Sequence, residues 1–121
     1  MSHLVLSRLA KLFVTCTLLG CAAAFAAPVV EIAIENHQFI PAVVAVPAHT
    51  KVKLLIHNRD SSAEEFESFE LNREKVILGN SKTIIFIGPL APGDYPFFGE
   101  FNPSSAQGVV RAADSSAEQP Q

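Results

Sequence analysis

The chain contains no tryptophan, a single methionine, which is Met1, and two cysteines, Cys16 and Cys21. Both cysteines lie inside an N-terminal segment that we expect to be removed, so the mature chain has no thiol. It can therefore form neither a disulfide nor a cysteine-ligated metal centre. The sequence also lacks a glycine-rich phosphate-binding loop, a plausible serine–histidine–acid arrangement and a cluster of basic residues. These absences argue against a hydrolytic enzyme and against a nucleic-acid-binding protein.

The N-terminal segment has the order of a secretory signal peptide. A basic start is followed by the apolar run LFVTCTLLGCAAAFA, which is too short to span a bilayer comfortably, and then by a small-residue pattern at 24–26. We expect a signal peptide over 1–26, export to the periplasm and no transmembrane helix in the mature chain. The sequence LLGC at 18–21 leaves an alternative, a lipoprotein cut with an acylated Cys21, but the apolar residues after it favour the cut after Ala26.

Removal of the signal peptide makes the protein more acidic. Arg8 and Lys11 are lost, so Lys plus Arg falls from 9 to 7 while all 12 Asp and Glu remain, and the formal net charge changes from −3 to −5. An acidic surface is unsuited to nucleic acid and compatible with cations. The 95 residues left of the 121 are enough for one small domain with a single core.

The mature chain consists of short segments in which apolar and polar residues alternate, separated by turn signals. This pattern predicts an all-β fold, a Greek-key β-sandwich of seven to eight strands over 27–113, followed by a disordered polar tail over 114–121. No segment has a sustained helical period, although a helical turn fits 60–65 or 70–76. The expected strands are 29–35, 42–48, 51–58, 64–71, 82–88, 94–98 and 108–112.

In two stretches the sequence predicts the direction in which individual side chains point. The sequence from Leu90 to Tyr95, LAPGDY, has the form of a tyrosine corner, in which the hydroxyl bonds back to nearby backbone, so Tyr95 is expected to be structural. In EEFES, Glu64 shares a strand face with the core residue Phe66, whereas Glu65 and Glu67 share the other face. An inward carboxylate at position 64 needs a partner. A solvated acidic rim is the alternative interpretation of this cluster.

The order of motifs over nearly the whole mature domain resembles the cupredoxin family. In particular, the chain resembles small periplasmic cupredoxin-like proteins associated with bacterial iron permeases, through EEFES at Glu64–Ser68 and REKVI at Arg73–Ile77. The other motifs are F-x-P-x-x-V-x-V-P-A-x-T-x-V from Phe39, N-x-D from Asn58, L-x-P-G-x-Y-x-F-F from Leu90 and A-x-G from Ala106.

The resemblance also shows where this sequence departs from the blue-copper members. Those proteins carry a histidine before the E-F pair and a cysteine and a histidine in the loop after the aromatic strand. Here these positions fall on Glu64, Gly99 and Asn102. Blue-copper chemistry requires a thiolate, so no blue-copper centre is expected. The iron-associated relatives tend to keep a histidine at the position of Asn102, and this chain lacks it as well.

What the resemblance leaves is an oxygen-rich set of candidate ligands. Carboxylates with one imidazole suit iron or manganese and can accept Cu(II). The resemblance therefore implies a periplasmic protein that binds iron or copper, and passes it on or helps oxidise it, ahead of a membrane iron permease. Binding is expected rather than turnover. The alternative is a degenerate, metal-free sandwich that acts through protein–protein contacts. The candidate metal ligands are Glu64, Glu65, His37, Glu67, Glu100 and Asn102.

Overall fold

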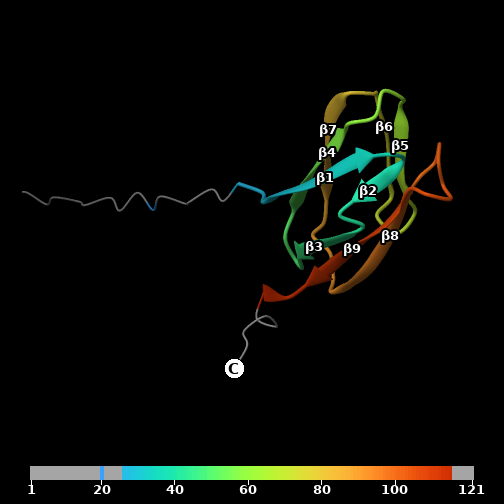
Figure 1. The fold of residues 1–121 in the computed structure, drawn as a ribbon. Coiled ribbons are helices and arrows are strands. Elements are labelled where there is room, and N and C mark those ends of the chain that lie inside the picture. The colour runs from blue at the N-terminus through green and yellow to red at the C-terminus, as the bar shows by residue number, and fades with distance from the viewer. Residues whose placement is uncertain (1–19, 21–25, 116–121) are drawn as a thin grey trace, which may run out of the picture.

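Nine strands form two mixed sheets that face each other in the computed structural model, which describes residue 20 and residues 26–115 (Figure 1). Sheet A has the strand order β2-β1-β4-β7, and sheet B has the order β3-β9-β8-β5-β6. The strands are β1 (Val29–Glu35), β2 (Gln38–Ile40), β3 (Val43–Pro47), β4 (Val52–Asn58), β5 (Glu64–Ser68), β6 (Arg73–Ile77), β7 (Ser81–Ile87), β8 (Gly93–Gly99) and β9 (Gln107–Ala113).

The all-β sandwich predicted from the sequence is confirmed, but the structure adds two strands to the seven segments expected. β2 is only three residues long and follows β1 through a tight turn, so it lacks a pattern of its own. In the segment 70–76, for which a helical turn was one possibility, the structure has a turn that ends at Asn72 and then β6. β6 pairs antiparallel with β5, and this tertiary pairing overrides its weak local pattern. None of the described residues forms a helix long and apolar enough to cross a membrane. Most of the predicted signal peptide and most of the predicted tail lie outside the described residues.

The core forms because the inward faces of both sheets carry branched aliphatic and aromatic residues. In β4, for example, Val52, Leu54 and Ile56 are buried while the residues between them are half-exposed, as expected for a strand with one face on the core. Two parallel pairings, β1 with β4 and β3 with β9, join segments far apart in sequence. These long-range pairings fix which loops meet at each end of the sandwich.

Three aromatic rings fill the core below one end of the sandwich. Phe39 of β2, Phe66 of β5 and Phe97 of β8 are almost fully buried. The rings of Phe66 and Phe97 stack with centroids 4.9 Å apart, and Phe39 meets Phe97 edge-on at 4.9 Å. Such pairs contribute beyond the area that they bury. These contacts fix β5 and β8 relative to each other. The start of β5, before Phe66, and the loop after β8 belong to the site described below.

The opposite end of β8 contains the predicted tyrosine corner. The Tyr95 hydroxyl donates a hydrogen bond to the carbonyl oxygen of Ala91 at 2.8 Å. Tyr95 is therefore structural, as the sequence predicted.

Candidate functional site

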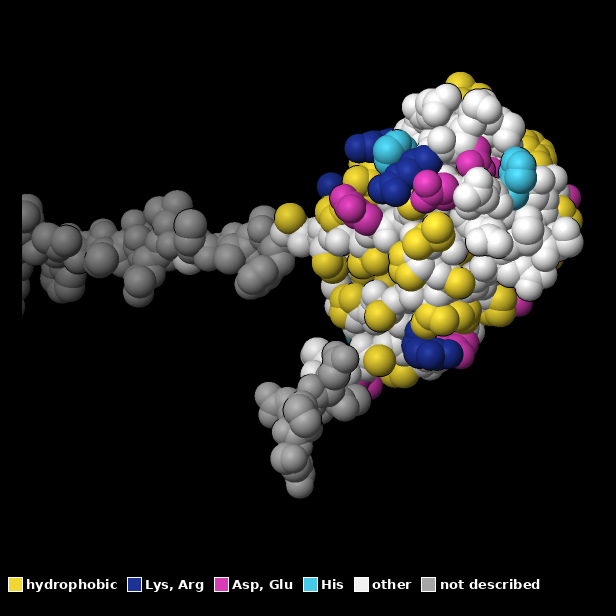
Figure 2. Space-filling view, in the orientation of Figure 1, with side chains coloured by type: hydrophobic (Ala, Val, Ile, Leu, Met, Phe, Trp, Pro, Cys, Tyr) yellow, Lys and Arg dark blue, Asp and Glu magenta, His cyan; other side chains and the backbone are white. Residues whose placement is uncertain are grey.

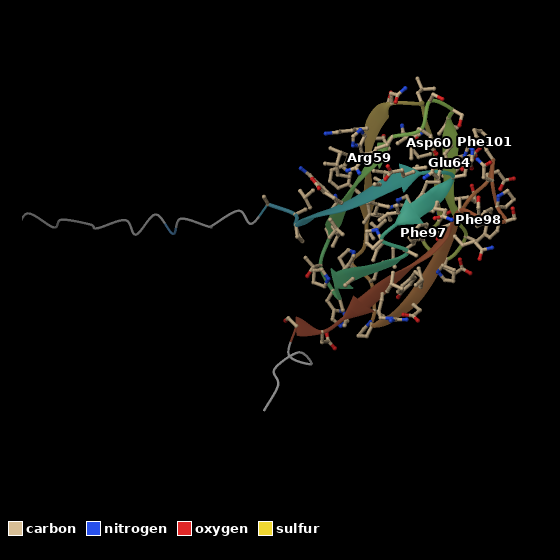
Figure 3. All side chains as sticks on the ribbon, in the orientation of Figure 1. Arg59, Asp60, Glu64, Phe97, Phe98 and Phe101 are labelled. Carbon is tan, nitrogen blue, oxygen red and sulfur yellow. The ribbon has the colours of Figure 1, made fainter. Side chains whose placement is uncertain are left out.

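The candidate site lies where the β1–β2 turn, the β4–β5 connection and the β8–β9 loop meet, and we call this region the polar end. Figure 3 shows Asp60, Glu64 and Phe101 together there, with the ring of Phe97 deeper in the sandwich. β5 enters the polar end at Glu64, and its alternation is the one predicted. Glu64 and Phe66 point into the sandwich, whereas Glu65 and Glu67 lie half-buried on the outer face.

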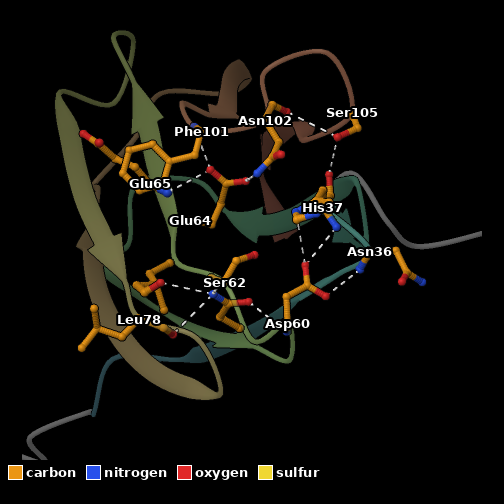
Figure 4. A network of polar contacts seen from close by, with 12 residues as sticks. Asn36, His37, Asp60, Ser62, Glu64, Glu65, Leu78, Phe101, Asn102 and Ser105 are labelled. Atoms are coloured by element: carbon orange, nitrogen blue, oxygen red, sulfur yellow. Dashed lines mark hydrogen bonds and ion pairs between the residues drawn. The ribbon is translucent and has the colours of Figure 1, made fainter.

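Glu64 is 1 % exposed, and its carboxylate accepts three hydrogen bonds (Figure 4). The backbone N–H groups of Glu65 and Phe101 both donate to Oε1, each at 2.9 Å. The side-chain amide of Asn102 donates to Oε2 at 2.8 Å. A buried carboxylate is costly unless it is paired or hydrogen-bonded, and here N–H donors supply that compensation. Two of the six predicted ligands, Glu64 and Asn102, therefore bind each other.

The β8–β9 loop is also closed by its own backbone. The N–H of Gly99 donates to the carbonyl of Ala106 at 2.8 Å, and the N–H of Ala106 donates to the carbonyl of Asn102 at 2.8 Å. Gly99 is buried, and a Cβ atom at this position would lie 2.6 Å from Cδ of Glu64 and 2.6 Å from Cβ of Ala106. Real Cβ atoms do not approach other heavy atoms this closely. The Glu64 carboxyl group therefore occupies the space beside Gly99.

A blue-copper centre does not fit these residues. The position at which the family's copper-binding cysteine would stand is Gly99, which has no side chain and no room for one while Glu64 keeps its place. No described residue at the polar end is a cysteine or methionine, so the sulfur ligands of such a centre are missing there.

His37, a third predicted ligand, lies in the β1–β2 turn. Both turn residues, Asn36 and His37, have left-handed backbone angles, with φ of 52° and 56°, as a tight hairpin turn requires. Their N–H groups donate to the carboxylate of Asp60 at 2.8 Å and 2.9 Å, and Nδ1 of His37 lies 3.7 Å from the same carboxylate. The Ser105 hydroxyl donates to the carbonyl of His37 at 2.7 Å, which joins this turn to the β8–β9 loop (Figure 4).

Asp60 is a functional element of this network that the sequence analysis did not single out. The pKa of its carboxyl group is lowered, chiefly because the N–H of His37 donates to it, with the N–H of Asn36 and the charge of His37 acting in the same direction. The motif N-x-D, which begins at Asn58 and ends at Asp60, was the sequence feature that could have indicated this role. Asn58 is fully buried and holds the β4–β5 connection, since its amide donates to the carbonyls of Ser62 and Ile77.

The other predicted carboxylates form a separate cluster on the outer face of sheet B. Carboxylate oxygens of Glu65, Glu67 and Glu74 all lie within 4.8 Å of one another. Glu74 was missed because it belongs to the unexpected strand β6, whose register places it opposite Glu67. We call these three residues the outer cluster. No Lys, Arg or His makes an ion pair with it in the part of the chain that the structure describes.

The carboxyl groups of two members of the outer cluster have raised pKa values. The pKa of Glu65 is raised, first because its carboxyl group lies within hydrogen-bonding reach of Glu74, and further by desolvation and by the charges of Glu74, Glu100 and Glu67. The pKa of Glu67 is raised by desolvation, then by the charges of Glu74 and Glu100. Glu100, another predicted ligand, is therefore near enough to add to the negative field.

A shallow hollow of about 270 Å³ lies on sheet A, and it reaches Arg59 of the β4–β5 connection. Its lining mixes charges of both signs, including Glu31, His57, Arg59 and Lys82. Figure 2 shows basic, acidic and histidine side chains side by side over β1 and β4, above a largely apolar area. Arg59 is paired with Glu35 at 3.7 Å, so this mixed surface presents no uniform field for a ligand of one sign.

The fold defines a class, namely all-β sandwiches of two mixed sheets. The cupredoxin-like domain model matches residues 8–112, and the chain belongs to the cupredoxin-like family. An uncharacterized protein of Rickettsia prowazekii (strain Madrid E), RP394, is 45% identical over 85 residues, which is 70% of this chain and 68% of that protein.

Solved structures of copper proteins share this fold at low sequence identity. Auracyanin A, a blue copper protein from Chloroflexus aurantiacus, gives a TM-score of 0.63 at 12% identity, covering 73% of this chain and 100% of that one. Amicyanin from Paracoccus versutus gives 0.57 at 16% identity, covering 75% and 87%. The metal-binding domain of the Cu(I)-exporting ATPase CopA from Streptococcus pneumoniae D39, solved with Cu(I), gives 0.57 at 15% identity, covering 74% and 100%. These likenesses establish the fold.

Proposed function

We propose that this protein is a periplasmic, cupredoxin-like metal-binding protein of a bacterial iron uptake system. It binds iron, or copper, through oxygen ligands and passes it on, or helps oxidise it, ahead of a membrane permease. The proposed location rests on the signal-peptide pattern, and the proposed permease partner rests on the motifs EEFES and REKVI. Binding is the central part of this proposal, because the described residues include a cluster of three carboxylates.

The observation that carries this proposal is the convergence of Glu65, Glu67 and Glu74 within 4.8 Å on a fold whose solved relatives include copper-binding proteins. Carboxylates are hard ligands that favour iron and manganese over Cu(I). The pKa of Glu65 is raised chiefly by its contact with Glu74 and the pKa of Glu67 chiefly by desolvation, and the charges of neighbouring carboxylates add to both shifts. A bound cation would relieve the repulsion between these charges. The predicted ligands Glu64, Asn102 and His37 lie at the polar end and are not part of this cluster.

A second function, the metal-free sandwich that acts through protein contacts, is favoured by a different observation. The Glu64 carboxylate already accepts three N–H donors, and its oxygens are buried. A cation at the position of the family's metal would have to displace these donors. If the outer cluster binds no cation either, the protein works without one.

Calorimetric titration distinguishes the two functions. The mature protein is titrated with Fe(II) under anaerobic conditions and with Cu(II) in air, beside a Glu65→Gln/Glu67→Gln variant and a control that loses the same charge elsewhere, Glu31→Gln/Glu70→Gln. We expect binding by wild type and control, and at least tenfold weaker binding by the cluster variant, about 1.4 kcal/mol. Equal titrations of all three proteins, at the level of non-specific background, would support the metal-free function instead.

A further inference from the structure

We propose that the Glu64 carboxylate takes the structural place of the family's metal ion, so that the polar end is complete without any ion. In this arrangement, which we call the Glu64 clasp, Glu64 of β5 holds the β8–β9 loop through Phe101 and Asn102. The inference is independent of the proposed function, because the clasp can hold the loop whether or not a cation binds to the outer cluster.

The Glu64 carboxylate can connect the same segments as a metal ion would, because it accepts several hydrogen bonds. A metal ion at this end of the fold would join β5 to the β8–β9 loop by accepting electron pairs from both. The carboxylate joins the same two segments with the opposite polarity, since it accepts N–H donors from both, one from Glu65 and two from the loop. Charge-assisted hydrogen bonds of this kind are about twice as strong as neutral ones. Among the described residues, no buried side-chain nitrogen or oxygen is left without a partner.

The second argument is the space around Gly99. Any side chain there would begin 2.6 Å from the Glu64 carboxyl carbon. A ligand side chain at position 99 and an inward glutamate at position 64 therefore exclude each other. The two residues form a matched pair, in which the missing side chain of Gly99 creates the room that the carboxylate fills. The third replaced position, Asn102, supplies the amide that binds Oε2.

The third argument is that the clasp ties the loop into a larger network. The Ser105 hydroxyl connects the same loop to the β1–β2 turn through the carbonyl of His37, and Asp60 holds that turn from the other side (Figure 4). Three segments distant in sequence are thus joined by hydrogen bonds alone. The N–H of Phe101 donates to Glu64 Oε1 at 2.9 Å, so loss of the clasp should expose this amide to hydrogen exchange.

Amide hydrogen exchange, measured by NMR on the mature protein in excess EDTA, tests the clasp directly. We expect the Phe101 amide to exchange at least tenfold more slowly than an unprotected amide, and addition of Fe(II) or Cu(II) to leave that protection unchanged. A Phe101 amide that exchanges freely in EDTA and becomes protected only with metal would overturn the proposal. This measurement needs no variant, so it decides the matter even if Glu64 cannot be replaced.

Substitutions test whether Glu64 is the group that accepts the hydrogen bond from the Phe101 N–H. Glu64→Gln should lose the Phe101 protection at least tenfold, whereas Glu67→Gln, which removes an outward carboxylate from the same strand, should retain it. Asn102→Ala removes the amide donor to Oε2, so it should also weaken the protection, and metal should not restore it. Restoration by Fe(II) or Cu(II) would show that an ion can hold the loop at this end, and the clasp would be wrong. Absence of metal binding by wild type would contradict the proposed function and leave the clasp intact.

Discussion

Glu64 and Glu65 are neighbours in β5 with the same side chain, yet the fold treats their charges in opposite ways. Glu64 is buried and surrounded by N–H donors, so its charge is compensated inside the protein. Glu65 faces outward among other carboxylates, and its pKa is raised by them. One residue of offset along a strand reverses the side on which a side chain lies. Acidic residues that are adjacent in a motif therefore need not form a single site.

The largest expected effect is on Glu64. Glu64→Gln removes the charge that three donors share and places an amide N–H₂ against at least one of them, so we expect the free energy of unfolding to fall by roughly 3 kcal/mol. Chemical denaturation at pH 7 measures it. Glu65→Gln serves as the control in the adjacent position and should not destabilise the protein. Equal losses in the two variants would remove the distinction drawn between the two carboxylates.

Asp60 extends the comparison to a second carboxylate that is compensated by N–H donors. Asp60→Asn should lower the free energy of unfolding by about 2 kcal/mol, since both bonds to the β1–β2 turn lose their charged acceptor. Because its pKa is lowered in the fold, the stability that Asp60 contributes is present above its ordinary pKa and is lost as the pH falls through the lowered value. Denaturation curves of wild type and Asp60→Asn should therefore converge in acid. Curves that stay parallel down to pH 2 would contradict this role.

Tyr95, at the other end of β8, is a structural residue outside the polar end. Tyr95→Phe removes the solvent-exposed bond to Ala91 and should cost roughly 1 kcal/mol of stability. Phe101 amide exchange and cation affinity should remain those of wild type, because the corner is separated from the polar end by the length of β8. A collapse of cation affinity with unchanged stability would assign Tyr95 to the site.

Substitutions in the outer cluster should change stability least. Their effect on stability should also depend on pH in the opposite direction to that of Asp60. Since the pKa values of Glu65 and Glu67 are raised in the fold, their contribution favours the folded state at low pH and is lost as the pH rises through the raised values. A Glu65→Gln/Glu67→Gln variant should thus be slightly more stable than wild type at pH 7 and equal to it near pH 4. Thermal unfolding at the two pH values checks the sign, and a destabilised variant at pH 7 would contradict it.

Much of the fold and part of the site could be predicted from the sequence. The alternation of EEFES gave the inward direction of Glu64, and LAPGDY gave the corner at Tyr95, because both depend on local geometry. The need of Glu64 for a partner was also predictable, but the partner was expected to be a metal. Its donors include the backbone N–H of Phe101, 37 residues away, and backbone groups leave no mark on a sequence. Glu74 was missed because only the pairing of β6 with β5 brings it to Glu67.

The central claim is that the buried and the outward carboxylates have different tasks, one holding the loop and the other binding the cation. Parallel anaerobic titrations of wild type, Glu64→Gln and Glu67→Gln with Fe(II) test it most directly. We predict that Glu67→Gln weakens Fe(II) binding at least tenfold, about 1.4 kcal/mol, and that Glu64→Gln leaves the affinity within a factor of about three. The reverse order, with affinity lost in Glu64→Gln and kept in Glu67→Gln, would contradict the claim and place the cation at the polar end.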